Sequence, residues 1–385
     1  MDALTTPSNW QKIRLGDICE IVKGQQINKI SLNNTDKYPV INGGIDFLGY
    51  TNKFNISKNT IAISEGGTCG YVRFMTSDFW SGGHNYSLQK ISNKVNNLCL
   101  YHILKSYEKD IMKLGVGSGL KNIQLKTLKD FEILLPPLNE QIAIANILSD
   151  LDHYLCSLDA LILKKESVKK ALSFELLSQR KRLKGFNQAW QKVRLGDICY
   201  LKNGFSFKSD LFKNMGIPII RISNISSVDN CINTNDLVFY DPILIDNDYI
   251  LKQGDLILAM SGATTGKSCL YNLNKIAYLN QRVGVFRAKT SFCYDFLVQF
   301  VFSELFTSRL KLILAAGAQP NISSFDIEDF EILLPPLNEQ IAIANILSAL
   351  DSEIISLKNK KRQFENIKKA LNHDLMSAKI RVLKE

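Results

Sequence analysis

The stretch DFEILLPPLNEQIAIANILS at Asp130–Ser149 decides how this chain is built, because the same twenty letters return unchanged at Asp329–Ser348. A second repeat, WQKIRLGDIC at Trp10–Cys19, returns as WQKVRLGDIC at Trp190–Cys199. Repeats of this length indicate an internal duplication. The chain therefore contains two copies of one plan, each a variable block followed by a shared block. The variable blocks are residues 1–129 and 190–328, and the shared blocks are residues 130–189 and 329–385.

Each shared block predicts one long helix. Paired prolines at 136–137 and 335–336 suit a helix start, where proline costs no hydrogen bond. Apolar residues then recur every three or four positions, which is typical of a coiled-coil seam. The predicted seam is Leu138, Ile142, Ala145, Leu148, Leu151, Leu155, Leu158, Ile162, Val168, Leu172 and Leu176, with Leu337, Ile341, Ala344, Leu347, Leu350, Ile354, Leu357, Phe364, Ile367, Leu371 and Leu375 in the second copy.

The two helices are expected to pair antiparallel. Each is about 69 Å long if it runs from the prolines to the end of the basic segment. Parallel pairing would require the second variable block, about 40 Å across, to carry the chain back over that length. Antiparallel pairing needs no return. The variable blocks read as strand, glycine turn, strand, for example in IAISEGGTCGYVRF (61–74) and DLILAMSGATTGKSCLY (255–271). The expected fold class is thus α+β, with two similar globular domains separated by an antiparallel two-helix coiled coil and related by a pseudo-twofold repeat.

Composition narrows the possible functions. The chain has 385 residues, 45% hydrophobic and 22% charged, which is ordinary for a globular protein. No window reaches the length of apolar sequence expected of a membrane span, and the first residues do not resemble a secretion signal, so we expect a cytoplasmic protein without a membrane partner. The eight cysteines and four histidines are scattered, which predicts reduced thiols and no metal site. The net charge of +10 lies mostly in residues 1–129, which carry 16 basic and 9 acidic groups, and it favours a polyanionic partner.

None of the catalytic motifs that the sequence suggests is complete. SGATTGKS (261–268) has three residues between its glycines, whereas a phosphate-binding P-loop needs four. GVGSG (115–119) and LPPL (135–138, 334–337) resemble methyltransferase motifs but lack their functional flanks. No repeated Ser, Cys or Asp has a histidine near it that could activate a nucleophile. We therefore expect no enzyme activity and no cofactor.

Polar side chains in the loops of the variable blocks are the candidate binding residues. Arg, Asn, Gln and Lys are the side chains that read base edges, and phenylalanine can pack on bases or methyl groups. For any one of them taken singly, an ordinary turn residue is the better interpretation, and it is their repeated placement in both blocks that points to binding. The candidates are Lys23, Gln25, Gln26, Asn42, Gly43, Gly44, His84, Asn85, Lys121 and Asn122 in the first block, and Lys202, Phe205, Phe207, Lys208, Arg221, Asn224, Thr264, Thr265, Lys267, Asn280, Gln281, Arg282, Gln319 and Asn321 in the second. Arg221, Gln281 and Arg282 are the strongest expected base readers.

The whole layout resembles the specificity (S) subunits of type I restriction-modification systems. The resemblance rests on two variable blocks that each precede an LPPLNEQIAIANILS helix, on the WQKIRLGDIC and WQKVRLGDIC segments, and on the SGATTGK turn. It implies that each variable block is a target recognition domain that reads one half of a bipartite, asymmetric site in double-stranded DNA. It also implies that the helices set the spacer and dock two methyltransferase subunits, which restriction subunits join later.

Two other classes of function stay open on the residues alone. One is an enzyme, either a fused DNA methyltransferase or a nuclease, which binding of S-adenosylmethionine by the isolated chain would reveal. The other is a coiled-coil scaffold that joins two protein-binding modules. Salt-sensitive binding of duplex DNA in the presence of the methylase would argue against the scaffold.

Overall fold

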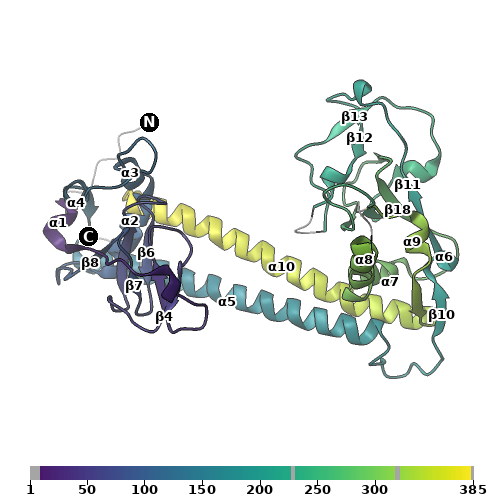
Figure 1. Ribbon diagram of the computed structural model, residues 1–385, viewed down its shortest axis with the longest axis horizontal. Helices are drawn as coiled ribbons and strands as arrows, with labels where there is room; N and C mark the ends of the chain where they lie inside the picture. Colours follow the sequence, from purple (N-terminus) through teal and green to yellow (C-terminus); the bar gives the residue numbers. More distant parts are fainter. Residues whose placement is uncertain (1–8, 227–229, 317–320, 383–385) are drawn as a thin grey trace. The chain divides into compact units, whose positions relative to one another are not determined.

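The computed structural model describes residues 9–226, 230–316 and 321–382 (Figure 1). Two compact units make up the chain, one of Met1–Ala160 with Asn359–Glu385 and the other of Leu161–Lys358. Each unit contains one variable block and part of both shared blocks. The mixed helix and sheet content and the internal repeat confirm the predicted α+β fold class.

The first unit contains three sheets and four α-helices ahead of its long helix. β1 (Gln11–Arg14) pairs antiparallel with β9 (Glu132–Leu135). A four-stranded antiparallel sheet has the order β2 (Glu20–Lys23), β8 (Asn85–Gln89), β5 (Thr60–Ser64), β6 (Val72–Met75). A three-stranded sheet has the order β4 (Gly49–Thr51), β3 (Tyr38–Ile41), β7 (Trp80–Ser81). The helices are α1 (Leu15–Ile18), α2 (Asn97–Ser106), α3 (Glu108–Lys113) and α4 (Leu125–Lys129), with a 3-10 turn at Lys29–Ser31.

The second unit repeats this plan, but the counterpart of the three-stranded sheet, called the distal sheet below, has four strands. β10 (Gln191–Arg194) pairs with β19 (Glu331–Leu334), and the four-stranded sheet has the order β11 (Cys199–Asn203), β18 (Val283–Ala288), β15 (Leu256–Ala259), β16 (Ser268–Leu270). The distal sheet has the order β13 (Val238–Tyr240), β12 (Ile217–Ile220), β17 (Ala277–Leu279), β14 (Ile250–Leu251). Its helices are α6 (Leu195–Ile198), α7 (Tyr294–Val301), α8 (Glu304–Ala316) and α9 (Ser324–Glu328), with 3-10 turns at Ser209–Leu211, Ile222–Asn224 and Asn247–Tyr249.

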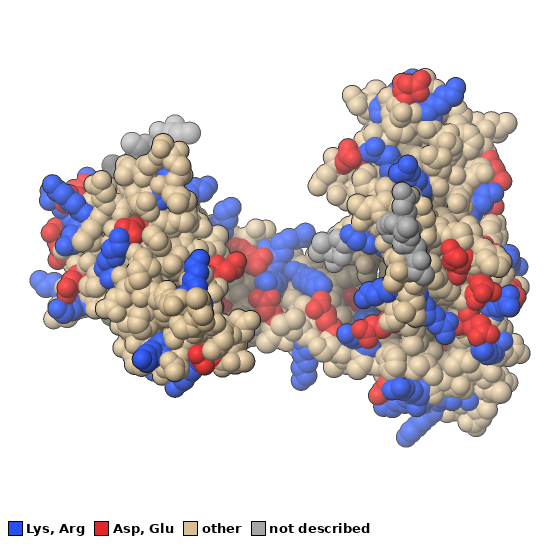
Figure 2. Space-filling model, viewed as in Figure 1, with Lys and Arg blue, Asp and Glu red and all other residues tan. Residues whose placement is uncertain are grey.

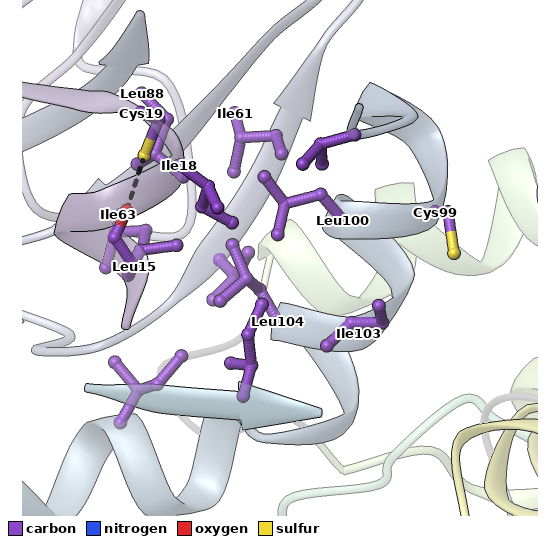
Figure 3. Packing of buried hydrophobic residues seen from close by; sticks show 14 of the residues in the cluster. Leu15, Ile18, Cys19, Ile61, Ile63, Leu88, Cys99, Leu100, Ile103 and Leu104 are labelled. Carbon is purple, nitrogen blue, oxygen red and sulfur yellow. Dashed lines mark hydrogen bonds between the residues drawn. The ribbon is translucent and has the colours of Figure 1, made fainter. Parts of the chain in front are cut away.

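The core of the first unit follows from two periodicities (Figure 3). Along β5, Ile61 and Ile63 face one side of the sheet and are fully buried, whereas Ala62 faces the other side. On α2, Leu100, Ile103 and Leu104 lie three and four positions apart and pack against the same cluster. Each fully buried aliphatic side chain contributes about 1.5–3 kcal/mol. This core fixes the sheet from whose strand ends the candidate loops emerge.

The shared blocks form two 40-residue helices, α5 (Leu138–Leu177) and α10 (Leu337–Met376). Their ion pairs show an antiparallel arrangement inside each unit taken by itself. In the first unit, Lys368 pairs with Asp152 and Lys361 pairs with Asp159. In the second unit, Lys169 pairs with Asp351 and Lys165 pairs with Glu353. In both units, the higher-numbered of the two lysines pairs with the lower-numbered of the two acids on the other helix, as antiparallel pairing requires.

The predicted seam is wrong at the start of each helix. Leu138, Ile142, Leu337 and Ile341 are exposed, and Ile144 and Ile343 are buried in their place. A glutamine fixes the first turn in each copy. The amide of Gln141 donates to the carbonyls of Pro136 and Lys94 and accepts from the Asn96 N–H, and the amide of Gln340 donates to the Pro335 carbonyl and accepts from the Cys293 N–H. These side chains bond the first turn of each helix to its recognition block. Further along, Val168 and Ile367 are also exposed.

Helix α10 is the one helix among the described residues that is long and apolar enough to cross a membrane. The composition argument overlooked it because acidic and basic residues are spread along its length. Those charges pair with α5, as Asp351 does with Lys169 and Lys361 with Asp159. Charged side chains are costly in hydrocarbon, so these pairs favour packing against α5 over a membrane span.

Candidate nucleic-acid interface

Five loops of the first recognition block meet at one end of its four-stranded sheet. One loop follows each of the strands β2, β3 and β5, a fourth precedes β8, and the fifth contains residues 121–123. Backbone hydrogen bonds join them, from Gly24 N to Asn85 O (2.8 Å), Gln25 N to Ser81 O (2.8 Å), Glu65 N to His84 O (2.8 Å) and Ile123 N to Glu65 O (2.9 Å). Position 24 requires glycine, because a Cβ there would lie 2.2 Å from the Gly82 carbonyl oxygen. The structure thus brings the predicted loops of the first block together.

A buried carboxylate lies at the centre of this first-block loop cluster. Glu65 is 8% exposed, and its Oε1 lies 2.5 Å from Lys23 Nζ while its Oε2 lies 3.7 Å from His84 Nδ1. Tyr86 donates its hydroxyl to the Ile123 carbonyl (2.9 Å), and burial together with Glu65 raises the pKa of Tyr86 to about 12. Lys23 and His84 are exposed and therefore accessible to a ligand. Sequence reasoning missed Glu65, although a carboxylate inside a glycine turn was the available signal.

The second block has the same backbone framework with different side chains. Its loop bonds run from Gly204 N to Val283 O (3.0 Å), Phe205 N to Leu279 O (2.8 Å), Met260 N to Arg282 O (2.9 Å) and Ile322 N to Met260 O (2.8 Å). These bonds match those of the first block one for one. They make Met260 the counterpart of Glu65, Arg282 the counterpart of His84, and Phe205 the counterpart of Gln25.

The same comparison extends to the loops that follow β3 and β12. Gly82 N bonds to Ile41 O and Asn280 N bonds to Ile220 O, so Asn280 and Gln281 take the places of Gly82 and Gly83. Arg221 then takes the place of Asn42. The two loop clusters are therefore one scaffold with different chemistry at corresponding positions.

Several predicted residues are exposed where the loops meet. In the first block these are Gln25, Gln26, Lys121 and Asn122 besides Lys23 and His84, and in the second they are Lys208, Gln281, Arg282 and Asn321. The side chain of Arg282 makes no hydrogen bond or ion pair with any residue in the described ranges. Thr264, Thr265, Lys267 and Asn280 are half-buried, as are Asn42 and Gly44.

Three predicted residues have buried side chains and are better explained by packing, so we leave them out of the proposed interface. Asn224 is 0% exposed, and its amide accepts from Arg221 N and donates to the carbonyls of Asn233 and Asp236. Phe207 is stacked on Tyr278 at 5.5 Å between ring centroids. Asn85 is buried beside Ser64. Composition could not reveal this, because burial depends on tertiary contacts.

Other predicted residues are held by neighbours. Arg221 Nη2 donates to the Asp236 carbonyl (2.8 Å) and carboxylate (2.9 Å). Lys202 Nζ lies 3.8 Å from Asp246 and over the Tyr249 ring. Thr264 Oγ1 donates to the Ile222 carbonyl, Gly43 is buried, and half-buried Phe205 packs edge-on against Phe207. Gln319 lies outside the described residues.

Charge alone does not mark an interface. On the face drawn in Figure 2, basic side chains are interspersed with acidic ones and much of the surface is uncharged. The difference between the two loop clusters therefore lies in individual side chains.

Known proteins share this architecture. The model of the type I restriction modification DNA specificity domain matches residues 7–165 and 187–366, which is one match for each repeat. The chain belongs to this specificity family. A type I restriction enzyme specificity subunit of Methanocaldococcus jannaschii, MjaVIII, is 28% identical over 99% of this chain and 95% of its own length. A second specificity subunit from that organism, the putative MjaX protein, is 30% identical over 94% of this chain and 84% of its own length.

Solved structures of specificity subunits agree with the fold. The crystal structure of the type I restriction-modification S subunit from M. genitalium aligns with a TM-score of 0.71 at 23% identity, covering 97% of both chains. At this identity the likeness supports the fold. Together with the family match, it confirms the resemblance drawn from the sequence.

Proposed function

We propose that this chain is the DNA-binding specificity subunit of a type I restriction-modification complex, with each recognition domain reading one half of a bipartite, asymmetric site. Methyl transfer and cleavage belong to partner subunits, and this chain is non-catalytic. The observation that carries the proposal is the shared backbone framework of the two loop clusters, which presents different side chains at matching positions. His84 of the first domain corresponds to Arg282 of the second, and Glu65 corresponds to Met260. One scaffold with two sets of side chains is what reading two different half-sites requires.

The repeated helix starts are the proposed docking sites for two methyltransferase subunits. Ile142 is 44% exposed in the first unit, and Ile341 is 44% exposed in the second. Leu138 and Leu337 lie one turn earlier and are also exposed. Exposed apolar side chains that group together often mark protein interfaces. Because the segment is identical in both copies, it suits two copies of the same partner.

The helix pair is the proposed spacer between the half-sites, and restriction subunits are the proposed later partners. Both α5 and α10 begin in one unit and end in the other. The pair is thus the part of the chain whose length can limit the distance between two reading domains. We also propose a cytoplasmic location, where the chain can reach DNA.

The function is tested in cells that carry this chain with the methylase subunit of its system. Mapping of methylated bases should give one motif with two different specified parts and an unspecified gap. The purified complex should bind a duplex with that motif, and binding should weaken steeply as salt rises. Methylation without a two-part motif, or motif binding by the methylase without this chain, would contradict the proposal.

Docking is tested by the subunit ratio of the complex. Ile142→Asp and Ile341→Asp should each remove one methylase, and the double variant should remove both, measured by native mass spectrometry. Leu163→Asp is the matched control, because Leu163 is an exposed leucine on α5 outside the repeated segment. Unchanged ratios in the double variant would exclude this surface as the docking site.

A further inference from the structure

Glu65 is the most unusual group in the proposed interface, because it is an acid buried at the centre of a surface meant for a polyanion. Its backbone N–H donates to the His84 carbonyl, and its carbonyl accepts from Ile123 N, so both sides of the residue are fixed. The Glu65 side chain is 11% exposed, and its Oε1 lies 2.5 Å from Lys23 Nζ. A negative charge in this place works against phosphate binding, so it requires another explanation.

The fold itself does not require an acid at this position. Met260 takes the corresponding place in the second domain, with the same backbone bonds on either side. Asn203 takes the place of Lys23 there, and its amide oxygen accepts from Ser324 Oγ. The ion pair is therefore a property of the first domain alone, which points to the target of that domain.

The geometry of the ion pair limits what Lys23 can do. Lysine has three N–H donors on a flexible stem. One donor is directed at Glu65, and the ion pair restricts the rotation of the stem. The Lys23 side chain is 53% exposed, so the other donors of its ammonium stay accessible to a ligand. A lysine that approaches base edges finds two acceptors side by side, O6 and N7, only on guanine.

We infer that Glu65 is a positioning residue that holds Lys23 for a guanine in the half-site read by the first domain. This inference rests on the proposed function and adds the identity of one base. Glu65 itself does not touch DNA. It acts by fixing the direction of the Lys23 donors, as preorganised contacts do in other specific sites.

The test uses the complex of this chain with its methylase, after the wild-type motif has been mapped. Glu65→Met introduces the residue found at the corresponding place in the second domain, and Glu65→Gln keeps the shape without the charge. Both variants should lose about tenfold of the discrimination at one guanine of the first half-site. Every other position of the motif, including the whole second half-site, should stay as it is. Binding to unrelated duplex should be equal or tighter, because one negative charge has gone.

A double-mutant cycle shows whether Glu65 acts through Lys23. Lys23→Ala should relax the same guanine, and Lys23→Ala with Glu65→Met should lose no more discrimination than either change alone. Lys109→Ala is the control, because Lys109 is an exposed lysine on α3 outside the loop cluster, and its loss should leave the motif unchanged. Thermal unfolding of each variant detects loss of folding, and Glu65→Gln carries the test if Glu65→Met unfolds.

Several results would overturn the inference. They are an unchanged motif in both Glu65 variants, relaxation at a base other than guanine, equal relaxation across the first half-site in a folded variant, or additive effects in the cycle. A wild-type complex that methylates no bipartite motif would instead overturn the proposed function. The two failures are therefore distinguishable.

Discussion

His102 on α2 and Gln299 on α7 occupy matching places in the two units. The Asn96 N–H bonds to Gln141 and the Cys293 N–H bonds to Gln340, which sets the two helices in the same register on the shared blocks. Gln299 donates to Asp351 at 3.0 Å. His102 is 4% exposed, and burial, helped by nearby Lys368 and opposed by Asp152, lowers its pKa to about 4.

The low pKa of His102 predicts acid sensitivity. The imidazole is neutral when folded and takes up a proton more easily when unfolded, so its contribution is full above pH 6.5 and is lost as the pH falls toward 4. Between pH 7 and 5 this loss is about 2 kcal/mol. His102→Gln, which copies the second unit, should remove that part of the pH dependence in denaturant unfolding. Equal pH slopes for both proteins would show that His102 does not carry it.

At the loop clusters, Arg282 and Arg221 should behave differently. Arg282→Ala and Gln281→Ala should each cost about 1–3 kcal/mol in binding and relax one position of the second half-site. Arg221→Ala should mainly lower the unfolding temperature, because its guanidinium holds Asp236. Methylation maps of the three variants check this. An unchanged motif in both Gln281→Ala and Arg282→Ala would remove the loops before β18 from the interface.

At the scale of elements, the sequence predicted what is periodic and missed what depends on tertiary contacts. The repeat and the three-and-four spacing were enough for α5 and α10, and the size of the second variable block against the helix length was enough for their antiparallel pairing. The prediction for the first turn of each helix was wrong, because Gln141 and Gln340 bond this turn to the recognition domain. Residue type pointed to the candidate loops but could not separate exposed Arg282 from buried Asn224. Glu65 was missed because an acid is not expected on a surface proposed to bind DNA.

A buried glutamate lies at the start of each long helix and pairs with an arginine that follows the end of the other long helix. Glu339 is 0% exposed and accepts two bonds from Arg182 and one from Trp190. Arg182→Ala should destabilise the fold by about 3 kcal/mol, since it leaves a buried carboxylate without its cation. Lys181→Ala, at an exposed pair, should cost under about 1 kcal/mol. Similar unfolding midpoints for the two variants would contradict this assignment.

The length of the helix pair should set the gap in the target. One heptad added to each helix, beside the Asp159–Lys361 ion pair, keeps the apolar pattern and adds about 10 Å. At about 3.4 Å per base pair, the unspecified gap should widen by roughly three base pairs in the methylation map. An active variant with the original gap would show that the helices do not set the spacing.

At the scale of the whole molecule, the contacts of the two units repeat each other. Arg381 binds Glu140 in the first unit as Arg182 binds Glu339 in the second, and Trp10 and Trp190 donate to the same two glutamates. Each shared block therefore presents the same groups to either recognition domain. A recognition domain should consequently be replaceable by the other, because it meets the same neighbours in both places.

The most direct measurement is the methylation map of a chain in which residues 190–328 are replaced by a second copy of residues 10–129. If each recognition domain reads one half-site, this chain with its methylase should methylate a motif with two identical, inverted halves. Both halves should match the part of the wild-type motif that Glu65 and Lys23 variants alter. Methylation of the original asymmetric motif by this chain would contradict the assignment of one domain to each half-site.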